Sequence, residues 1–268
     1  MNREDGGVAR AVGLELPIIA RAVDAIVCSL LSGGRLFYVG AGTSGRLAVL
    51  DAAECPPTFG TSPRQVQALI AGGRRALVGA VEGAEDSAAR GARDLAQRKT
   101  SRRDVVVGIT ASGTTPYVLG ALRLARRRGA VTVGVTSNRR SPLARSAQIV
   151  IAPRVGPEIL AGSTRLKAGT AQKMVLNMLS TTAFIRLGRV FDNWMIDAAL
   201  SNQKLRDRGL RILAESSGRA VSAARHALRQ SGHNLRVALV MLKRNVDAEH
   251  ARTLLRRARG NLRRALGE

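Results

Sequence analysis

The chain alternates short, continuous apolar runs with longer amphipathic stretches. Apolar positions from about residue 8 to residue 31 recur every three or four residues, which predicts a helix that ends at Ser32-Gly33-Gly34. Five later runs are rich in valine and isoleucine and predict buried strands at 35–40, 65–72, 104–110, 131–137 and 149–153. Because the segments between these runs are long enough for helices, the pattern predicts an α/β fold with a parallel sheet covered on both faces.

The last third of the chain lacks this alternation. Residues 167–189 predict one long, mostly buried helix, and no strand signal follows Leu205. The sequence Asn-Leu-Arg at 234–236 recurs at 261–263, each time shortly after a glycine. We therefore predict short helices with glycine breaks in a small three-helix unit, and two domains, residues 1–205 and residues 206–268.

Composition limits the class of protein. Of the 268 residues, 45% are hydrophobic, yet no apolar run approaches the roughly 20 residues of a membrane-spanning helix. The N-terminus begins with mixed charges and has no apolar segment typical of a secretory signal. Cys28 and Cys55 are too few for a disulfide framework or a clustered metal site. We expect a cytoplasmic globular protein with no membrane partner.

The net charge of +24 would by itself suggest binding to a polyanion. Nearly all of the positive charge is arginine, however, and aromatic residues are only 3% of the chain. The stacking surfaces that single-strand binding proteins place between basic residues are therefore largely missing. We expect no nucleic-acid partner.

Histidine is confined to the last fifth of the chain, at His226, His233 and His250. A site in the first two hundred residues must therefore work with carboxylates, hydroxyls or backbone groups.

Two glycine-rich loops follow predicted strands. Residues 40–45 (GAGTSG) follow the first strand and open a helix, where backbone N–H groups can hold a phosphate. The same loop matches the dinucleotide fingerprint, but Arg74-Arg75 stand where that fold places an acidic residue. An arginine that binds the extra phosphate of NADP would also account for them, so this alternative stays open.

The second loop, residues 111–116 (ASGTTP), follows the strand at 104–110 and lies where ligands of open α/β sheets bind. Two hydroxyl-rich loops suit a sugar phosphate better than a nucleotide base. In the alternative interpretation, Ser112 and Thr115 only cap the next helix. A third cluster, residues 162–165, precedes the long helix. The candidate phosphate ligands are Thr43, Ser44, Ser112, Thr114, Thr115 and Ser163.

Two carboxylates are candidates for acid and base chemistry. Glu54 is expected at the C-terminal end of a helix that Pro56-Pro57 stop, and Glu85 is expected to begin the next helix. The helix dipole would then favour the protonated form of Glu54 and the ionised form of Glu85, as an acid and base pair requires. Alternatively, Glu85 simply complements the dipole at a helix N-terminus.

Four segments resemble N-acetylmuramic acid 6-phosphate etherases, a family with a sugar isomerase (SIS) domain. They are residues 40–60 (GAGTSGRLAVLDAAECPPTFG), 81–87 (VEGAEDS), 111–118 (ASGTTPYV) and 162–181 (GSTRLKAGTAQKMVLNMLST). The resemblance runs from Asn2 to the C-terminus, although members usually have a further segment before the part that matches residues 2–12. It implies a flavodoxin-like SIS domain with a small UBA-like helical domain, a homodimer, and no metal or cofactor.

The resemblance also implies an activity, namely cleavage of the D-lactyl ether of N-acetylmuramic acid 6-phosphate during recycling of cell-wall sugars. By motif, Glu54 is similar to the proton donor of the family and Glu85 to its other active-site carboxylate. Two alternatives share the architecture. A non-catalytic SIS protein, like glucokinase regulatory proteins, would sense a sugar phosphate, and a sugar-phosphate isomerase would need a base at C2 but no acid at C3.

Overall fold

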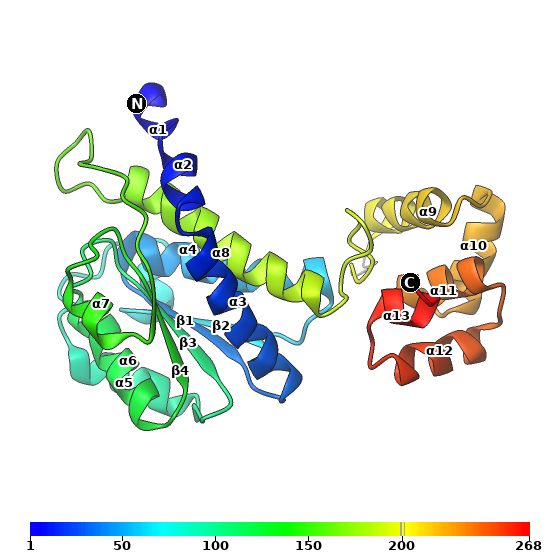
Figure 1. Ribbon diagram of the computed structural model, residues 1–268, viewed down its shortest axis with the longest axis horizontal. Helices are drawn as coiled ribbons and strands as arrows, with labels where there is room; N and C mark the ends of the chain where they lie inside the picture. The colour runs from blue at the N-terminus through cyan, green and yellow to red at the C-terminus, as the bar shows by residue number, and fades with distance from the viewer. Residues whose placement is uncertain (199, 201) are drawn as a thin grey trace. The chain divides into compact units, whose positions relative to one another are not determined.

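The computed structural model describes residues 1–198, 200 and 202–268, and their packing divides into two compact units. Unit 1 consists of Met1–Ala53 and Ser62–Ala183, and unit 2 consists of Glu54–Thr61 and Phe184–Glu268. Figure 1 traces the chain through both units. These packing units do not show which parts of the chain fold independently. The domain boundary predicted from the sequence, between residues 205 and 206, therefore stays a prediction.

Within the described residues, unit 1 is built on a five-stranded parallel sheet with the order β2-β1-β3-β4-β5. Its strands are β1 (Leu36–Gly40), β2 (Val66–Ile70), β3 (Val105–Ile109), β4 (Val131–Val135) and β5 (Ile149–Ile151). Each lies within one of the five predicted runs, so the predicted sheet is confirmed. The order is that of flavodoxin-like folds and differs from the order in dinucleotide-binding folds, which weakens the NADP alternative.

Helices cover both faces of this sheet, with α5, α6 and α7 on one face and α3, α4 and α8 on the other (Figure 1). Because neighbouring side chains of a strand point to opposite faces, Phe37 and Val39 pack against Leu95 of α5 and Leu122 of α6. The helical elements that begin in unit 1 are α1 (Asn2–Asp5), α2 (Val8–Gly13), α3 (Leu16–Leu31), α4 (Gly42–Phe59), the 3-10 helix η1 (Gly73–Leu77), α5 (Ala88–Gln97), α6 (Pro116–Arg127), α7 (Pro142–Ser146) and α8 (Lys167–Arg186).

The N-terminal helix differs from the prediction of one helix over residues 8–31. It is two helices, α2 and α3, which meet at Leu14 and Glu15. Pro17 lies in the first turn of α3, and its missing N–H cannot donate to the carbonyl of Gly13 four residues earlier. The apolar period continues across this break, which is why periodicity alone does not show it.

Polar contacts join α4 to α8 inside unit 1. The hydroxyl of Ser44 donates to Gln172 Oε1 at 2.8 Å. Two turns further along α4, Asp51 Oδ1 accepts from Asn177 Nδ2 at 2.9 Å and from Ser180 Oγ at 3.0 Å. Burial raises the pKa of the Asp51 carboxyl, and the hydrogen bonds from its neighbours oppose that rise. The long helix predicted from residue 167 onward is confirmed by α8.

Unit 2 contains more helices than the predicted three. In the described residues they are α9 (Gln203–Ser217), α10 (Val221–Gln230), α11 (Leu235–Arg244), α12 (Ala248–Arg257) and α13 (Leu262–Leu266). Of the two further breaks, the one between α9 and α10 falls at Gly218, which has φ +66°. The one between α11 and α12 has no glycine, because Asn245 adopts the left-handed conformation with φ +52° and Asp247 caps the next helix. The sequence analysis predicted helix breaks only at glycines, so the break between α11 and α12 was not predicted.

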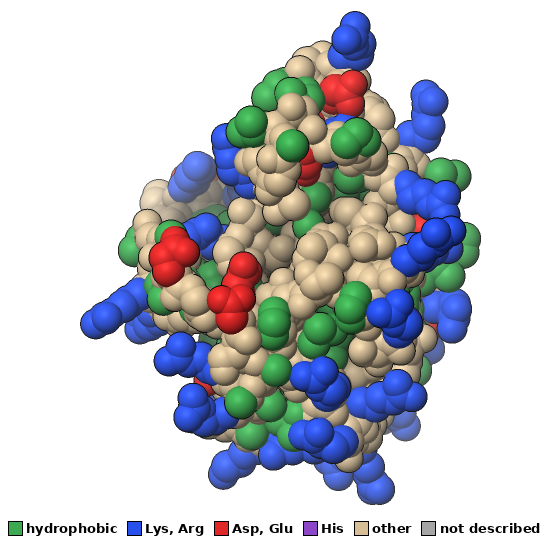
Figure 2. Space-filling view, turned by 90° about the vertical axis from the view of Figure 1, so that its left-hand side faces the viewer, with side chains coloured by type: hydrophobic (Ala, Val, Ile, Leu, Met, Phe, Trp, Pro, Cys, Tyr) green, Lys and Arg blue, Asp and Glu red, His purple; other side chains and the backbone are tan. Residues whose placement is uncertain are grey.

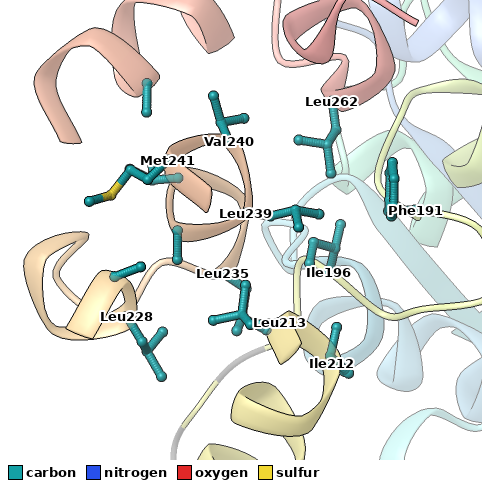
Figure 3. Close-up of a cluster of buried hydrophobic side chains, with 14 of the residues drawn as sticks. Phe191, Ile196, Ile212, Leu213, Leu228, Leu235, Leu239, Val240, Met241 and Leu262 are labelled. Carbon is teal, nitrogen blue, oxygen red and sulfur yellow. The ribbon is translucent and has the colours of Figure 1, made fainter. Parts of the chain in front are cut away.

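The core of unit 2 forms around α11. Leu235, Leu239 and Val240 of this helix belong to one buried cluster with Leu213 of α9 and Leu262 of α13 (Figure 3). The weak sequence repeat reflects two similar helix caps in this unit. Asn234 and Asn261 each cap a helix by accepting a hydrogen bond from the backbone N–H three residues later.

Candidate active site

The two glycine-rich loops lie at the same edge of the sheet. Gly40, the last residue of β1, pairs with Ile70 of β2 and Ile109 of β3, so the loops after these three strands leave the sheet side by side. The strand order reverses direction between β1 and β3, and ligands of open α/β sheets bind outside the carboxyl ends of the strands at such a point. This edge is therefore the candidate site.

The first loop packs tightly against the sheet. A Cβ on Gly40 would fall 2.7 Å from the backbone N of Gly45, and one on Gly45 would fall 2.5 Å from Cγ1 of Ile70. Gly42 has φ +51°, a conformation that other residues rarely adopt. Within this loop Thr43 is half-buried, and the buried Ser44 uses its hydroxyl on Gln172.

The second loop carries a connected set of hydroxyls. Thr110 Oγ1 lies 2.8 Å from Thr115 Oγ1 and 3.3 Å from Ser112 Oγ, and Ser112 Oγ lies 2.9 Å from Thr114 Oγ1. The backbone N–H of Gly113 donates to Thr110 Oγ1 at 3.3 Å. We call Thr110, Ser112, Thr114 and Thr115 the hydroxyl cluster. Ser112 and Thr114 are exposed, so their hydroxyls can reach a ligand.

The interpretation that Ser112 and Thr115 only cap a helix is wrong. Thr115 is the N-cap residue of α6 but its side chain makes no capping hydrogen bond, and Ser112 lies outside the cap. Sequence reasoning also missed Thr110, the buried residue on which the cluster is centred. Its position directly after β3 is the signal that could have identified it.

The third cluster lies next to the first loop. A Cβ on Gly169 of α8 would lie 3.5 Å from Thr43 Cγ2 and 3.4 Å from the carbonyl of Thr164. The start of α8 is already occupied, because Glu158 accepts hydrogen bonds from the backbone N–H groups of Lys167 and Ala168 at 3.0 and 2.9 Å. Ser163 is half-buried in the turn before the helix. Its role as a phosphate ligand stays a prediction.

Glu85 does not begin a helix, contrary to the prediction. Ser87 is the N-cap of α5 and accepts from the backbone N–H of Arg90, so the helix starts at Ala88. Glu85 lies in the preceding loop, where Gly83 has φ +67°. The carbonyl of Glu85 accepts from the backbone N–H of Tyr117 at 2.9 Å, and its carboxylate is exposed.

Glu54 does not end a helix either. Helix α4 continues through Pro56 and Pro57 to Phe59, so the two prolines do not stop it, although each lacks the N–H donor and its ring crowds the carbonyl four residues earlier. The helix stops at Gly60, which has φ +60°. Glu54 is exposed and belongs to unit 2, whereas Glu85 belongs to unit 1. The acid and base roles of these two residues stay predictions.

Glu82 and Glu85 line a cleft of about 190 Å³ together with Arg46 of α4. Arg46 was missed by the sequence reasoning. It is half-buried and binds the loop that carries the two glutamates, with Nε donating to the carbonyl of Leu77 at 3.2 Å and Nη2 donating to the carbonyl of Gly79 at 2.9 Å.

The surface of the chain is rich in positive charge. Figure 2 shows one face of the molecule, with Lys and Arg side chains dispersed around its margin and a central hollow surfaced mostly by backbone and uncharged polar side chains. Among the residues that the structure describes, no three His, Cys, Asp or Glu side chains gather as a metal site would need. In the same residues, no helix combines the length and the apolar character needed to cross a membrane.

Two sequence models of known domains match the chain. Residues 18–126 match the glucokinase regulatory protein N-terminal SIS domain, and residues 87–182 match the SIS domain. The predicted SIS fold is thereby confirmed.

Much closer relatives match nearly the whole chain. The N-acetylmuramic acid 6-phosphate etherases of Yersinia pestis (strain Pestoides F) and Yersinia pseudotuberculosis serotype O:1b (strain IP 31758) are each 54% identical over 266 residues. The match covers 99% of this chain and 90% of each relative.

Solved structures agree on the fold. A phosphoheptose isomerase from Francisella tularensis has a TM-score of 0.54 at 20% identity, covering 69% of this chain and 96% of that one. A phosphoheptose isomerase from Neisseria gonorrhoeae has a TM-score of 0.51 at 15% identity, covering 68% of this chain and 93% of that one.

Proposed function

The chain belongs to the N-acetylmuramic acid 6-phosphate etherase family, and from that premise we propose that it cleaves the D-lactyl ether of N-acetylmuramic acid 6-phosphate. Water replaces the lactyl group, and the products are N-acetylglucosamine 6-phosphate and D-lactate. The observation that carries the proposal is the 54% identity over 99% of the chain, with both candidate glutamates present at Glu54 and Glu85.

The hydroxyl cluster is suited to the 6-phosphate of the substrate. Exposed hydroxyls at Ser112 and Thr114 can donate to phosphate oxygens. Thr110 Oγ1 contacts Ser112 Oγ, which in turn contacts Thr114 Oγ1, so the three hydroxyls hold one another in one arrangement. The loop lies at the carboxyl end of β3, next to the amino end of α6, where the helix dipole favours an anion. Binding the phosphate there would fix the sugar relative to Glu85.

The reaction needs a base at C2 and an acid at C3. In the open-chain sugar, the proton on C2 is acidic because the C1 aldehyde lies next to it. Removal of that proton leaves a carbanion, which expels the lactyl oxygen from C3 and gives an unsaturated aldehyde. Water then adds to C3 and a proton returns to C2. A well-placed base or acid contributes roughly 10²- to 10⁴-fold to such a step.

We assign Glu85 as the base and Glu54 as the acid that protonates the departing lactate. The expected positions at helix ends no longer support this division, since α5 starts after Glu85 and α4 continues past Glu54. It rests instead on the motifs, in which Glu54 resembles the proton donor of the family. Both carboxylates are exposed, so a substrate can reach either one.

Release of D-lactate tests the proposed function directly. The purified chain is mixed with N-acetylmuramic acid 6-phosphate, and D-lactate is measured with a D-lactate dehydrogenase. Steady release that is lost in a Glu54→Gln, Glu85→Gln double variant is the expected result. No release by folded wild-type protein, at any substrate concentration, overturns the proposal.

A sensor of sugar phosphates is the second candidate, because residues 18–126 match the SIS domain of glucokinase regulatory protein. A sensor would bind N-acetylmuramic acid 6-phosphate without releasing lactate. The same assay, combined with calorimetric binding, separates the two functions.

We also propose that the protein is a cytoplasmic homodimer, as the family resemblance implies. Unit 1 exposes large apolar side chains that a second copy would bury, among them Leu14 at 78% and Leu160 at 62% exposure. Light scattering coupled to size-exclusion chromatography tests the dimer, and a mass of one chain at micromolar concentration would contradict it.

A further inference from the structure

Arg46 is a half-buried guanidinium whose hydrogen-bonding capacity is only partly used. Its Nε and one N–H of Nη2 donate to the carbonyls of Leu77 and Gly79, and these are its only partners among the described residues. A guanidinium has five N–H donors, so the second N–H of Nη2 and both of Nη1 remain. These remaining donors lie on the edge of the group that faces away from the two carbonyls.

The cleft beside Arg46 is negatively charged. Glu82 and Glu85 both line it, and of the described lining residues Arg46 is the only cation. Any ligand that brings a third negative charge into this cleft therefore needs Arg46 to offset the repulsion from the two glutamates.

The proposed substrate brings such a charge. Its lactyl group ends in a carboxylate and is attached to C3, one carbon from the C2 proton that Glu85 is assigned to remove. Sugar phosphates without the lactyl group have no anion at this place. A planar guanidinium can present two parallel N–H donors to a carboxylate, and the contacts with Leu77 and Gly79 already hold Arg46 in place.

We propose that Arg46 binds the lactyl carboxylate and thereby makes the site specific for sugar phosphates that carry an acidic ether at C3. This inference rests on the proposed function and adds a specificity residue to it. The ionic contact also limits rotation of the leaving group about the C3–O bond, which keeps the ether oxygen oriented towards the acid that protonates it.

A purely positioning role for Arg46 makes a different prediction. If Arg46 only held the loop of residues 77–85, its loss would disturb Glu85 and slow every reaction that starts with removal of the C2 proton. The product, N-acetylglucosamine 6-phosphate, has the same C2 proton and no lactyl group. Exchange of that proton with deuterated water therefore reports on Glu85 without involving the carboxylate contact.

The experiment compares lactate release with product exchange in the full-length protein. Arg46→Gln should lower kcat/KM for lactate release roughly 10- to 100-fold more than it lowers the rate of exchange. A factor of this size corresponds to the loss of one hydrogen bond to a charged group. Arg46→Lys keeps the charge and should recover part of the loss. Arg123→Gln removes an exposed arginine from α6 and should change neither rate, which controls for net charge.

Changing the substrate instead of the protein avoids any folding defect in the variants. When the lactyl carboxylate is converted to its carboxamide, kcat/KM of the wild type should fall by a similar factor. Arg46→Gln should show equal kcat/KM for the acid and the amide. Equal losses of release and exchange in Arg46→Gln, or equal wild-type rates on acid and amide, overturn the inference. Failure of wild type to release lactate from the acid instead overturns the proposed function itself.

Discussion

Replacing Thr110 by valine tests whether the hydroxyl cluster binds the phosphate. Valine has the same shape as threonine but no hydroxyl, so the backbone N–H of Gly113 loses its acceptor, and Ser112 and Thr115 lose a partner. Gly113 is buried and cannot turn to water. The loop that should hold the phosphate would therefore lose its fixed arrangement.

The size of the effect follows from these contacts. A buried donor left without a partner costs about 1–3 kcal/mol. If that cost falls on the ligand-bound loop, KM for N-acetylmuramic acid 6-phosphate rises about 5- to 100-fold, since each 1.4 kcal/mol is about tenfold in affinity. We expect kcat to change by less than about threefold, because phosphate binding is common to the ground state and the transition state.

Thr132→Val is the matched control. Thr132 is a fully buried threonine in β4, and its hydroxyl donates to Gln148 Oε1 and accepts from the Gln148 backbone N–H, both at 3.2 Å. It pairs with Val106 near the start of β3, whereas the second loop follows the end of that strand. This variant should lower the thermal midpoint by a few degrees, as the loss of about 1 kcal/mol does in a domain of this size, and leave KM unchanged. An unchanged KM in Thr110→Val, or an equal rise in both variants, would refute the reasoning.

Three further predictions concern the carboxylates and the surface charge. Glu54→Gln should still exchange the C2 hydrogen of the substrate with deuterated solvent, as detected by NMR, while releasing little lactate. Glu85→Gln should lose both the exchange and the release. The reverse pattern would mean that Glu54 is the base and Glu85 the acid. Burial raises the pKa of Asp51, so the folded protein binds that proton more tightly than the unfolded chain, and stability falls as pH rises from 3.8 through the raised pKa. Asp51→Asn should therefore flatten the dependence of the thermal midpoint on pH, and an unchanged slope would contradict this. Finally, binding to mixed-sequence RNA should be weak and decline steeply with salt in a filter-binding titration, and nanomolar binding at physiological salt would revive a nucleic-acid function.

The sheet could be predicted from the sequence because its strands are buried on both faces. All residues of β1 and β3 are buried, so each appears as an uninterrupted apolar run rather than an alternating one. The ends of helices were harder to predict. Pro56 and Pro57 look like a stop signal but lie inside α4, and Ser87 rather than Glu85 caps α5 because its hydroxyl reaches the third backbone N–H beyond it.

The candidate site could be predicted only as a set of residue types at the ends of strands. The loops at 40–45 and 111–116 were identified because parallel strands end at one edge of a sheet. The residues that contact these loops could not be identified from the sequence, because they come from distant parts of the chain. Gln172, which binds Ser44, is 128 residues away from it, and Arg46 contacts carbonyls 31 and 33 residues away. Such pairs are determined by the packing of α4 against its neighbours.

Glu85 is positioned through its backbone, which suits a base that must reach a substrate proton. Arg46 holds the loop before it, and the N–H of Tyr117 holds its own carbonyl. Tyr117 is in turn fixed by the close packing of α5 and α6, where a Cβ on Gly91 would collide with the Tyr117 carbonyl and one on Gly120 would collide with the carbonyl of Ala88. Among the described residues no side chain binds the Glu85 carboxylate, so substrate does not have to displace an internal partner. The close contact of α5 and α6 at Gly91 and Gly120 thus fixes Tyr117 and, through its N–H, the backbone of Glu85, the proposed base.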